Sequence, residues 1–298
     1  MRAVVTGGAG FIGSHVVEAL IARGDEVTVV DDLSTGKREN VPDGAPLVVH
    51  DIREPLELDA DVVFHLAAQA DVRVSVDDPA FDAEVNVVGT LQVLEAARAA
   101  GAQVVFASTG GAIYGECERP AREDDERRPL APYGTAKLAG EEYLATYNRL
   151  HSTEHVSLRY GNVFGPRQDP HGEAGVVAIF LGRLGEAKPL TVFGDGRQTR
   201  DYVYVGDVAR ATLAAAGAGG GVFNVGTGRE TSVLELAELC GRVAGVEPEL
   251  VHVPPRPGEL QRSFLDPARA QDALGFRAET SLEDGLAATW RWLAGDRA

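Results

Sequence analysis

The stretch that decides the fold is Ala3-Val4-Val5-Thr6-Gly7-Gly8-Ala9-Gly10-Phe11-Ile12-Gly13, near the start of the chain. A short apolar run enters three glycines at the spacing Gly-x-x-Gly-x-x-Gly, and a stretch with helical character, residues 13–23, follows at once. Glycines let a backbone turn tightly and approach a phosphate without a clash from a Cβ atom. The first turn of a helix presents N–H groups and a partial positive charge to the same phosphate. This order of elements predicts a site for the pyrophosphate of a dinucleotide.

A second apolar run, residues 26–30, ends at Asp31 and Asp32. An acid at the end of the second strand can accept hydrogen bonds from the ribose of an adenosine. Gly-rich turns also join ordinary strands to helices, so the glycines alone are weak evidence. The acid in its expected place is what favours a dinucleotide.

The composition of the chain excludes several classes of protein. The 298 residues are 44% hydrophobic and can form one large domain or two closely associated ones. The formal net charge of -17 argues against a nucleic-acid partner, because phosphate backbones favour a basic face. The two cysteines, Cys117 and Cys240, form no CxxC pair, so we expect neither a metal site nor a disulfide framework. No stretch is typical of a signal peptide or of a membrane span, and we expect a soluble cytoplasmic protein.

Apolar strands alternate with helical patterns through the first half of the chain. We expect strands at residues 2–6, 26–30, 47–50, 62–66, 103–108 and 156–159, and helices at 13–23, 81–100 and 133–150. This alternation predicts an α/β fold of Rossmann type, a doubly wound parallel sheet covered on both faces.

The second half of the chain is less regular. We expect helices at residues 176–185, 207–216, 232–243 and 282–293, and strands at 190–192, 201–205 and 222–225. Our domain prediction is a dinucleotide-binding domain over residues 1–165, to which segments near 190–226 return. Residues 166–298 are expected to form a smaller, interleaved, mixed α/β lobe for the substrate.

A catalytic pair is indicated by Tyr133 and Lys137, which lie four residues apart on an expected helix and so share one face. A tyrosine with its ordinary pKa of about 10 is a poor base at neutral pH. A nearby ammonium and an oxidised nicotinamide both favour the phenolate, so the pair can provide a usable base. Upstream, an apolar strand delivers the hydroxyls of Ser108 and Thr109, either of which could bind the oxygen that loses its proton to the tyrosine.

These features together resemble the extended short-chain dehydrogenase/reductase superfamily and, within it, the nucleotide-sugar epimerases of the UDP-glucose 4-epimerase type. The resemblance in the first half rests on the glycine triplet, Phe64-His65-Leu66-Ala67-Ala68, Asn86, the two hydroxyls and the Tyr/Lys pair. In the second half it rests on Leu158-Arg159-Tyr160-Gly161-Asn162-Val163-Phe164-Gly165-Pro166, Phe193-Gly194-Asp195-Gly196-Arg197-Gln198-Thr199-Arg200-Asp201-Tyr202-Val203, Asn224-Val225-Gly226-Thr227-Gly228 and Arg256-Pro257-Gly258-Glu259. It therefore covers nearly the whole chain in order.

The resemblance implies NAD as the cofactor. The residues that it assigns to NAD are Gly7, Gly10, Phe11, Ile12, Gly13, Asp31, Asp32, Leu33, Asp51, Ile52, Leu66, Ala67, Ala68, Asn86, Tyr133, Lys137 and Tyr160. Asp31 favours NAD over NADP, because a 2′-phosphate would meet a carboxylate.

The resemblance also implies a UDP-sugar or dTDP-sugar as the substrate. The residues that it assigns to the substrate are Asn162, Val176, Phe193, Arg200, Asp201, Arg256 and Glu259. Arginine suits a diphosphate because its planar guanidinium can bind two phosphate oxygens at once. Residues 69, 73, 161 and 174–177 are candidates for the wall of the sugar pocket.

The turn after the catalytic strand departs from the family pattern by one extra residue. Counting from Phe106 places Thr109 at the catalytic hydroxyl, whereas counting back from Tyr114 places Gly110 there. We choose Thr109, because the strand fixes the register before the loop begins, and keep Ser108 as the second candidate. Relatives that eliminate water carry an acidic pair directly after the hydroxyl residue, where this chain has Gly110 and Gly111. A dehydratase would therefore lack its acid and base.

The activity implied by the resemblance is NAD-dependent 4-epimerisation of a UDP-sugar of the UDP-glucose/UDP-galactose type. It would proceed by transient oxidation at C4, rotation of the keto-sugar and re-reduction. A nucleotide-sugar dehydratase or reductase, or a non-enzymatic NAD-sensing protein, remains as an alternative. We expect a homodimer formed through the helices at residues 81–100 and 133–150, although an apolar stripe on these helices is equally expected to face the sheet.

Overall fold

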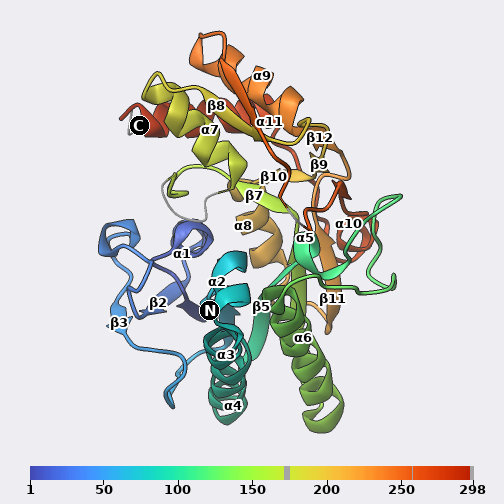
Figure 1. Cartoon of the computed structure of the whole chain (residues 1–298). Coiled ribbons are helices and arrows are strands. Elements are labelled where there is room, and N and C mark those ends of the chain that lie inside the picture. Colours follow the sequence, from blue (N-terminus) through green and yellow to red (C-terminus); the bar gives the residue numbers. More distant parts are fainter. Residues whose placement is uncertain (171–174, 257, 296–298) are drawn as a thin grey trace.

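The structure is a computed structural model that describes residues 1–170, 175–256 and 258–295. Its centre is a parallel sheet of seven strands in the order β11-β6-β5-β4-β1-β2-β3 (Figure 1). The strands are β1 (Arg2–Thr6), β2 (Glu26–Asp31), β3 (Leu47–Val49), β4 (Val62–His65), β5 (Gln103–Thr109), β6 (Val156–Tyr160) and β11 (Gly221–Val225). The chain builds outward from β1 to β3 and then crosses to β4 on the other side of β1. The predicted doubly wound sheet is confirmed, and its switch point lies between β1 and β4.

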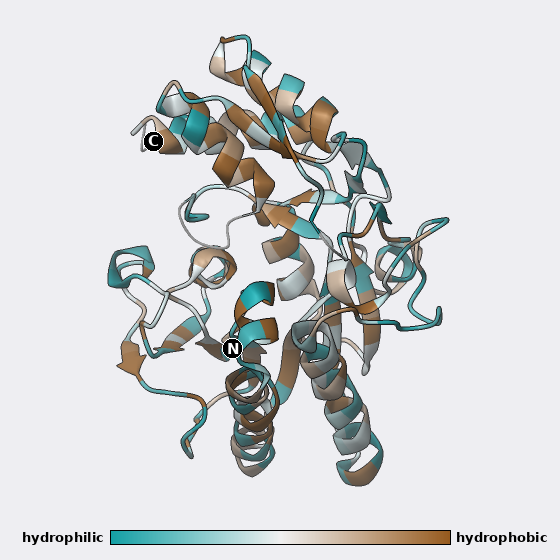
Figure 2. Ribbon diagram, in the orientation of Figure 1, coloured by the Kyte–Doolittle hydropathy of each residue, from teal (hydrophilic) through white to brown (hydrophobic). Residues whose placement is uncertain are grey.

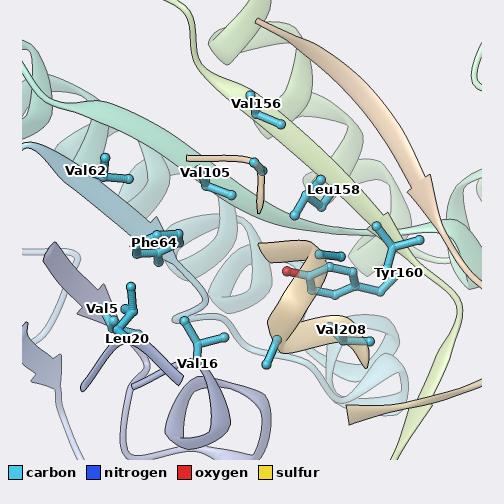
Figure 3. Close-up of a cluster of buried hydrophobic side chains, with 14 of the residues drawn as sticks. Val5, Val16, Leu20, Val62, Phe64, Val105, Val156, Leu158, Tyr160 and Val208 are labelled. Carbon is cyan, nitrogen blue, oxygen red and sulfur yellow. The ribbon is translucent and has the colours of Figure 1, made fainter. Parts of the chain in front are cut away.

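Helices cover both faces of this sheet. One face carries α1 (Phe11–Arg23), α8 (Val205–Ala214) and α10 (Ala268–Leu274), and the other carries α4 (Thr90–Ala100) and α6 (Pro132–His151). Neighbouring side chains of a strand lie on opposite faces of the sheet. Val5 packs with α1, as Figure 3 shows, while Val4 belongs to the core under α4. Burial on both faces explains why these strands are apolar without interruption, and each fully buried valine or leucine contributes about 1.5–3 kcal/mol.

The helix expected at residues 81–100 begins earlier and is not uniform. It is divided into α3 (Pro79–Ala83), a π-helical turn η2 (Glu84–Gly89) and α4. The side chain of Asp78 accepts a hydrogen bond from the Phe81 backbone N–H and caps α3, and Pro79 occupies the first helical position. This Asp-Pro start is a recognisable helix signal that the apolar periodicity did not contain.

A second lobe lies above the sheet in Figure 1. It packs α7 (Val176–Gly185), α9 (Val233–Ala244) and α11 (Leu282–Leu293) around the parallel pair β8 (Leu190–Phe193) and β13 (Leu250–Val253). Figure 2 shows α7 as largely apolar, in keeping with its place in this core. The N-cap of α9 is Ser232, which forms a reciprocal capping box with Glu235.

Short strands join the lobe to the sheet. β7 (Asn162–Phe164) pairs in parallel with β10 (Tyr202–Tyr204), and β9 (Thr199–Arg200) lies between β12 (Thr231–Ser232) and β14 (Arg262–Ser263). The remaining short elements are η1 (Arg38–Asn40), α2 (Val72–Asp77) and α5 (Gly110–Ile113). Of these short elements only β10 was expected, because runs of two to six residues show little or no periodicity.

After residue 165 the chain contributes α8 and β11 to the main sheet and its cover. Residues near 190 form β8, which pairs with β13 in the upper lobe. The division into two domains near residue 165, with later segments returning to the first, stays a prediction. No helix in the described ranges is both long and apolar enough to cross a bilayer.

Candidate active site

The glycine turn has no room for a side chain at two of its glycines. Gly7 has a φ of +71°, and a Cβ there would lie 2.6 Å from the Ala67 nitrogen. A Cβ at Gly13 would lie 2.0 Å from the Gly7 carbonyl oxygen. Helix α1 therefore packs directly on the turn, with Gly10 as its N-cap and no side chain capping its first N–H groups. The start of α1 has the geometry that an anion such as a pyrophosphate requires.

The Asp31 carboxylate lies beside this turn at the end of β2. Its Oδ2 accepts a hydrogen bond from the Ala9 N–H at 3.0 Å, and its Oδ1 accepts one from the Leu33 N–H at 2.9 Å. Asp32 instead accepts bonds from the N–H and hydroxyl of Ser34. Burial raises the pKa of Asp31. The two backbone bonds fix its orientation, and each carboxylate oxygen keeps a further lone pair for a ribose hydroxyl.

Two more of the predicted cofactor residues flank the turn. Leu66 and Ala67 follow β4 and lie against Gly7, and Ala68 comes next in the chain. Farther along the chain, the Asp51 carboxylate pairs with Arg53, whose hydrogen bonds lower the pKa of that carboxyl.

Ile52 and Asn86 are both buried in the structure. Ile52 packs against Gly89. The Asn86 side chain bonds both the N–H and the carbonyl of Gln69, at 3.0 and 2.8 Å, and donates to Asp82 Oδ1 at 2.9 Å. Asn86 thereby fixes the loop that follows β4. Contacts of Asn86 and Ile52 with a cofactor remain predictions.

Tyr133 and Lys137 lie in the first turns of α6, which begins at Pro132. The Lys137 ammonium donates to the Ala107 carbonyl at 3.1 Å and lies 6.0 Å from the centre of the Tyr133 ring. Burial lowers the pKa of Lys137 to about 8, although the carboxylate of Asp82 opposes the shift. Burial and Asp82 both raise the pKa of Tyr133. Additional positive charge beside the phenol is therefore needed before it can act as a base at neutral pH.

The two candidate hydroxyls differ in their surroundings. The Ser108 hydroxyl is buried and donates to Glu141 Oε1 at 2.5 Å. Thr109 ends β5, and it borders the same cavity as Tyr133. Because the proton of Ser108 is committed to a carboxylate, the geometry favours Thr109 as the hydroxyl that meets a substrate oxygen.

A cavity of about 250 Å³ brings these groups together. The predicted residues that line it are Phe11, Ile12, Ser108, Thr109, Tyr133, Tyr160, Gly161, Asn162, Gly175, Val176 and Val177. They come from the start of α1, the ends of β5 and β6, the start of α6, β7 and the start of α7. Ala174, one candidate for the sugar pocket, lies outside the described residues.

Comparisons with known proteins agree with this geometry. Residues 3–226 match the NAD dependent epimerase/dehydratase family. The chain belongs to this family. It is 48% identical to the UDP-glucose 4-epimerase of Mycolicibacterium smegmatis, with 97% of each chain covered.

Two solved structures of UDP-glucose 4-epimerases are similar over nearly the whole chain. The Thermotoga maritima enzyme with UDP-glucose has a TM-score of 0.96 at 45% identity and is covered completely, as is this chain. The Thermus thermophilus enzyme in complex with NAD has a TM-score of 0.93 at 48% identity, with 99% of each chain covered. The glycine turn, which a Cβ would fill, and the Asp31 carboxylate beside it fit the cofactor of the family.

Two of the predicted contact residues form hydrogen bonds within the protein through their side chains. The Tyr160 hydroxyl shares a hydrogen bond with Thr212 Oγ1 at 2.8 Å inside the core shown in Figure 3. Tyr160 also lines the cavity, and its contact with a cofactor stays a prediction. The Asp201 carboxylate is buried and accepts bonds from the N–H and hydroxyl of Thr227 and from the N–H groups of Gly228 and Leu265. Asp201 therefore joins loops of this epimerase-family fold, and its contact with a substrate stays a prediction.

Four other residues that the family resemblance assigned to the substrate form two pairs outside this cavity. The Arg256 guanidinium lies 4.0 Å from the centre of the Phe193 ring. Arg200 donates to the Leu260 carbonyl at 2.9 Å and lies 3.8 Å from Glu259 Oε1. These pairings hold both guanidinium groups in defined positions, as the binding of a diphosphate requires.

A buried network that the sequence analysis missed supports the catalytic helix. Arg159, which is 1% exposed, donates to both oxygens of Glu141 and, at 2.7 Å, to the Tyr114 hydroxyl. Burial lowers the pKa of Arg159, but the pairing with Glu141 outweighs it and the net shift is upward. Glu141 also accepts a hydrogen bond from the Ser108 hydroxyl, so the network fixes α6 to β5 and β6. The only signal in the sequence is an arginine within an apolar strand.

Proposed function

We propose that this protein catalyses the NAD-dependent 4-epimerisation of a UDP-hexose of the UDP-glucose/UDP-galactose type. The observation that carries the proposal is the convergence of Thr109, Tyr133 and Asn162 on one cavity, with Lys137 beside the phenol. The activity of the M. smegmatis, T. maritima and T. thermophilus relatives supports it.

Binding of NAD is assigned to the glycine turn and the adjacent strand ends. The N–H groups at the start of α1 would hold the pyrophosphate, and Asp31 would bind the adenosine ribose. Lys137 would bind the nicotinamide ribose with the ammonium that now donates to Ala107. When bound, NAD supplies reversible acceptance of a hydride from C4 and so makes the reaction redox-neutral.

The protein's own part in the chemistry is to move one proton. The Tyr133 phenolate takes the proton of the sugar 4-hydroxyl, with the Thr109 hydroxyl as the bridge. The Lys137 ammonium stabilises that phenolate electrostatically. After the sugar has turned about its diphosphate link, Tyr133 returns the proton to the same oxygen. Arg200 and Arg256 hold the diphosphate during the turn.

The turn after Thr109 distinguishes this activity from dehydration. A Cβ at Gly111 would lie 4.0 Å from Thr109 Oγ1 and 3.5 Å from Asn162 Oδ1, so a side chain at this position would enter the cavity. A Cβ at Gly110 would lie 2.5 Å from the Leu265 side chain, which leaves no room for an acid there. Elimination of water needs a second acid or base at this place. The glycines therefore favour epimerisation over dehydration.

The test is a panel of UDP- and dTDP-sugars incubated with the purified protein and read by product analysis. We expect UDP-galactose to yield UDP-glucose without added reductant. Accumulation of a keto-sugar would support a dehydratase, and consumption of NADH or NADPH would support a reductase. An absence of hydride exchange with every sugar would support an NAD-sensing protein.

We also propose that the protein is a cytoplasmic homodimer. Phe81, Val88 and Tyr143 are exposed apolar or aromatic side chains on the segment from α3 to η2 and on α6, where an interface would form. Cys117 and Cys240 are free and buried, in keeping with a reducing compartment. Light scattering should give twice the chain mass of 31.5 kDa; a mass of one chain would contradict the dimer.

A further inference from the structure

Two buried polar atoms at the cavity have no hydrogen-bond partner among the residues that the structure describes. They are Gln168 Oε1 and the Tyr202 hydroxyl. Both residues line the cavity that also contains Thr109 and Tyr133. Buried polar atoms are almost always paired in native proteins, and an unpaired one costs roughly 1–3 kcal/mol. Two such atoms at one cavity indicate a ligand that forms hydrogen bonds with both of them.

The orientation of the Gln168 amide is fixed by its surroundings. Its Nε2 donates to the Val163 carbonyl at 3.2 Å, so exchanging the nitrogen and oxygen would bring two acceptors together. Gly175 also lies close to the Gln168 amide, since a Cβ built on Gly175 would be 3.0 Å from that Nε2. The unpaired atom of Gln168 is therefore a carbonyl oxygen, which can only accept.

Tyr202 lies close to a residue that the sequence already assigned to the substrate. In the parallel pair of β10 and β7, Tyr202 is the register partner of Asn162, so the two side chains leave the same face of this small sheet. Gln168 reaches the next residue of β7, Val163, through its amide. One end of the cavity thus carries an amide carbonyl and a phenol beside Asn162.

The chemistry of this end of the cavity selects a neutral group. Among the described residues that line the cavity, none carries a charged side chain. A hydroxyl could donate to Gln168 Oε1 and accept from the Tyr202 hydroxyl, whereas a carboxylate would place an anion against an acceptor. Because the Tyr202 phenol can donate or accept a hydrogen bond, it could bind one hydroxyl of the sugar before the sugar turns and another afterwards.

We propose that Gln168 and Tyr202 form a subsite for a hydroxyl of the hexose other than the 4-hydroxyl, which makes them specificity residues for a neutral sugar. This inference rests on the proposed function for the identity of the sugar nucleotide. It adds two residues that the sequence analysis did not single out.

The test compares calorimetric binding of UDP-galactose with binding of UDP, which lacks the sugar. We expect Gln168→Leu and Tyr202→Phe each to weaken UDP-galactose binding about 10-fold, as loss of one buried hydrogen bond does, and to leave UDP binding unchanged. The matched control is Tyr204→Phe, on the same strand but outside the lining of the cavity, which should change neither. Equal losses for both ligands would show a structural role and overturn the proposal, as would unchanged binding of UDP-galactose.

A deoxy-sugar series locates the hydroxyl and excludes a bound water. At least one of 2-, 3- and 6-deoxy-UDP-galactose should bind the wild-type protein about 10-fold more weakly, and this loss should vanish in Gln168→Leu. If each deoxy-sugar loses as much affinity in Gln168→Leu as in the wild type, no sugar hydroxyl binds the Gln168 carbonyl. The carbonyl would then bind only water, and the proposal would be overturned. UDP-glucuronate should bind the wild-type protein more weakly than UDP-glucose; equal binding would contradict selection of a neutral sugar. Binding does not require turnover, so failure of the epimerase assay would overturn the proposed function without deciding this subsite.

Discussion

The main sheet and the upper lobe contribute different groups to the proposed site and hold them differently. The sheet holds Tyr133 and Lys137 on a helix of 20 residues, fixed by the buried network of Arg159 and Glu141. The upper lobe carries Arg200 on a strand of two residues and Arg256 in a loop. Proton transfer requires positions that are constant, whereas a diphosphate can be held by long side chains from short elements. Changes in the sheet should therefore affect turnover or folding, whereas changes in the lobe should affect binding.

The largest effect is expected at the base. Tyr133→Phe should lower kcat by about 10³-fold, because it removes the group that takes and returns the proton. Calorimetry should show unchanged affinity for UDP, and circular dichroism should show an unchanged fold. A turnover rate near that of the wild type would exclude Tyr133 as the base.

The next largest effect concerns the folding of the sheet half. Arg159→Met leaves the Glu141 carboxylate buried without its cation, and should cost about 3–5 kcal/mol in denaturant unfolding. The double variant Arg159→Met with Glu141→Met removes both charges and should recover much of this loss. A single variant within about 1 kcal/mol of the wild type would show that the network does not support the sheet.

A smaller effect is expected in the lobe. Arg200→Ala should weaken UDP binding by roughly 10- to 100-fold, the range for loss of a charge-assisted hydrogen bond, and should leave NAD binding unchanged. The matched control is Arg197→Ala, since Arg197 is an exposed arginine of the same segment. Unchanged UDP affinity in Arg200→Ala, or an equal loss in Arg197→Ala, would remove Arg200 from the diphosphate site.

The smallest effect is expected at the N-cap of α9, where a substitution should destabilise the upper lobe without lowering kcat. Ser232→Ala removes the cap of α9 and should destabilise the protein by about 1 kcal/mol, as measured by urea unfolding. Thr231→Ala, one residue earlier, serves as the control. A loss of kcat in Ser232→Ala would show that the lobe positions the catalytic groups, contrary to the division described above.

The same two regions differ in what their sequences predict. β1, buried on both faces, and α7 and α11, each with a continuous apolar stripe, were predicted to the residue. β9, β12 and β14 were not, because a strand of two residues has no period and depends on its partners. The local sequence pattern therefore predicts an element that buries its own apolar face. It does not predict a short strand that exists only because it pairs with another strand.

The site shows the same limit. Tyr133 and Lys137 could be predicted because their spacing on one helix is local. The ion pair of Glu141 and Arg159 could not, since its members come from a helix and a strand 18 residues apart. The hydrogen bonds of the Asp201 carboxylate could not be predicted either, because the residues that donate to it, such as Thr227, lie 26 residues or more away.

The central claim, that the hydrogen removed from C4 returns to the same carbon, is tested most directly by isotope labelling. UDP-galactose carrying deuterium at C4 should be converted to UDP-glucose in ordinary water without added reductant. We predict that the product retains the deuterium at C4, as mass spectrometry and NMR would show. Loss of the deuterium to solvent, or a keto-sugar as the end product, would contradict epimerisation by reversible oxidation at C4.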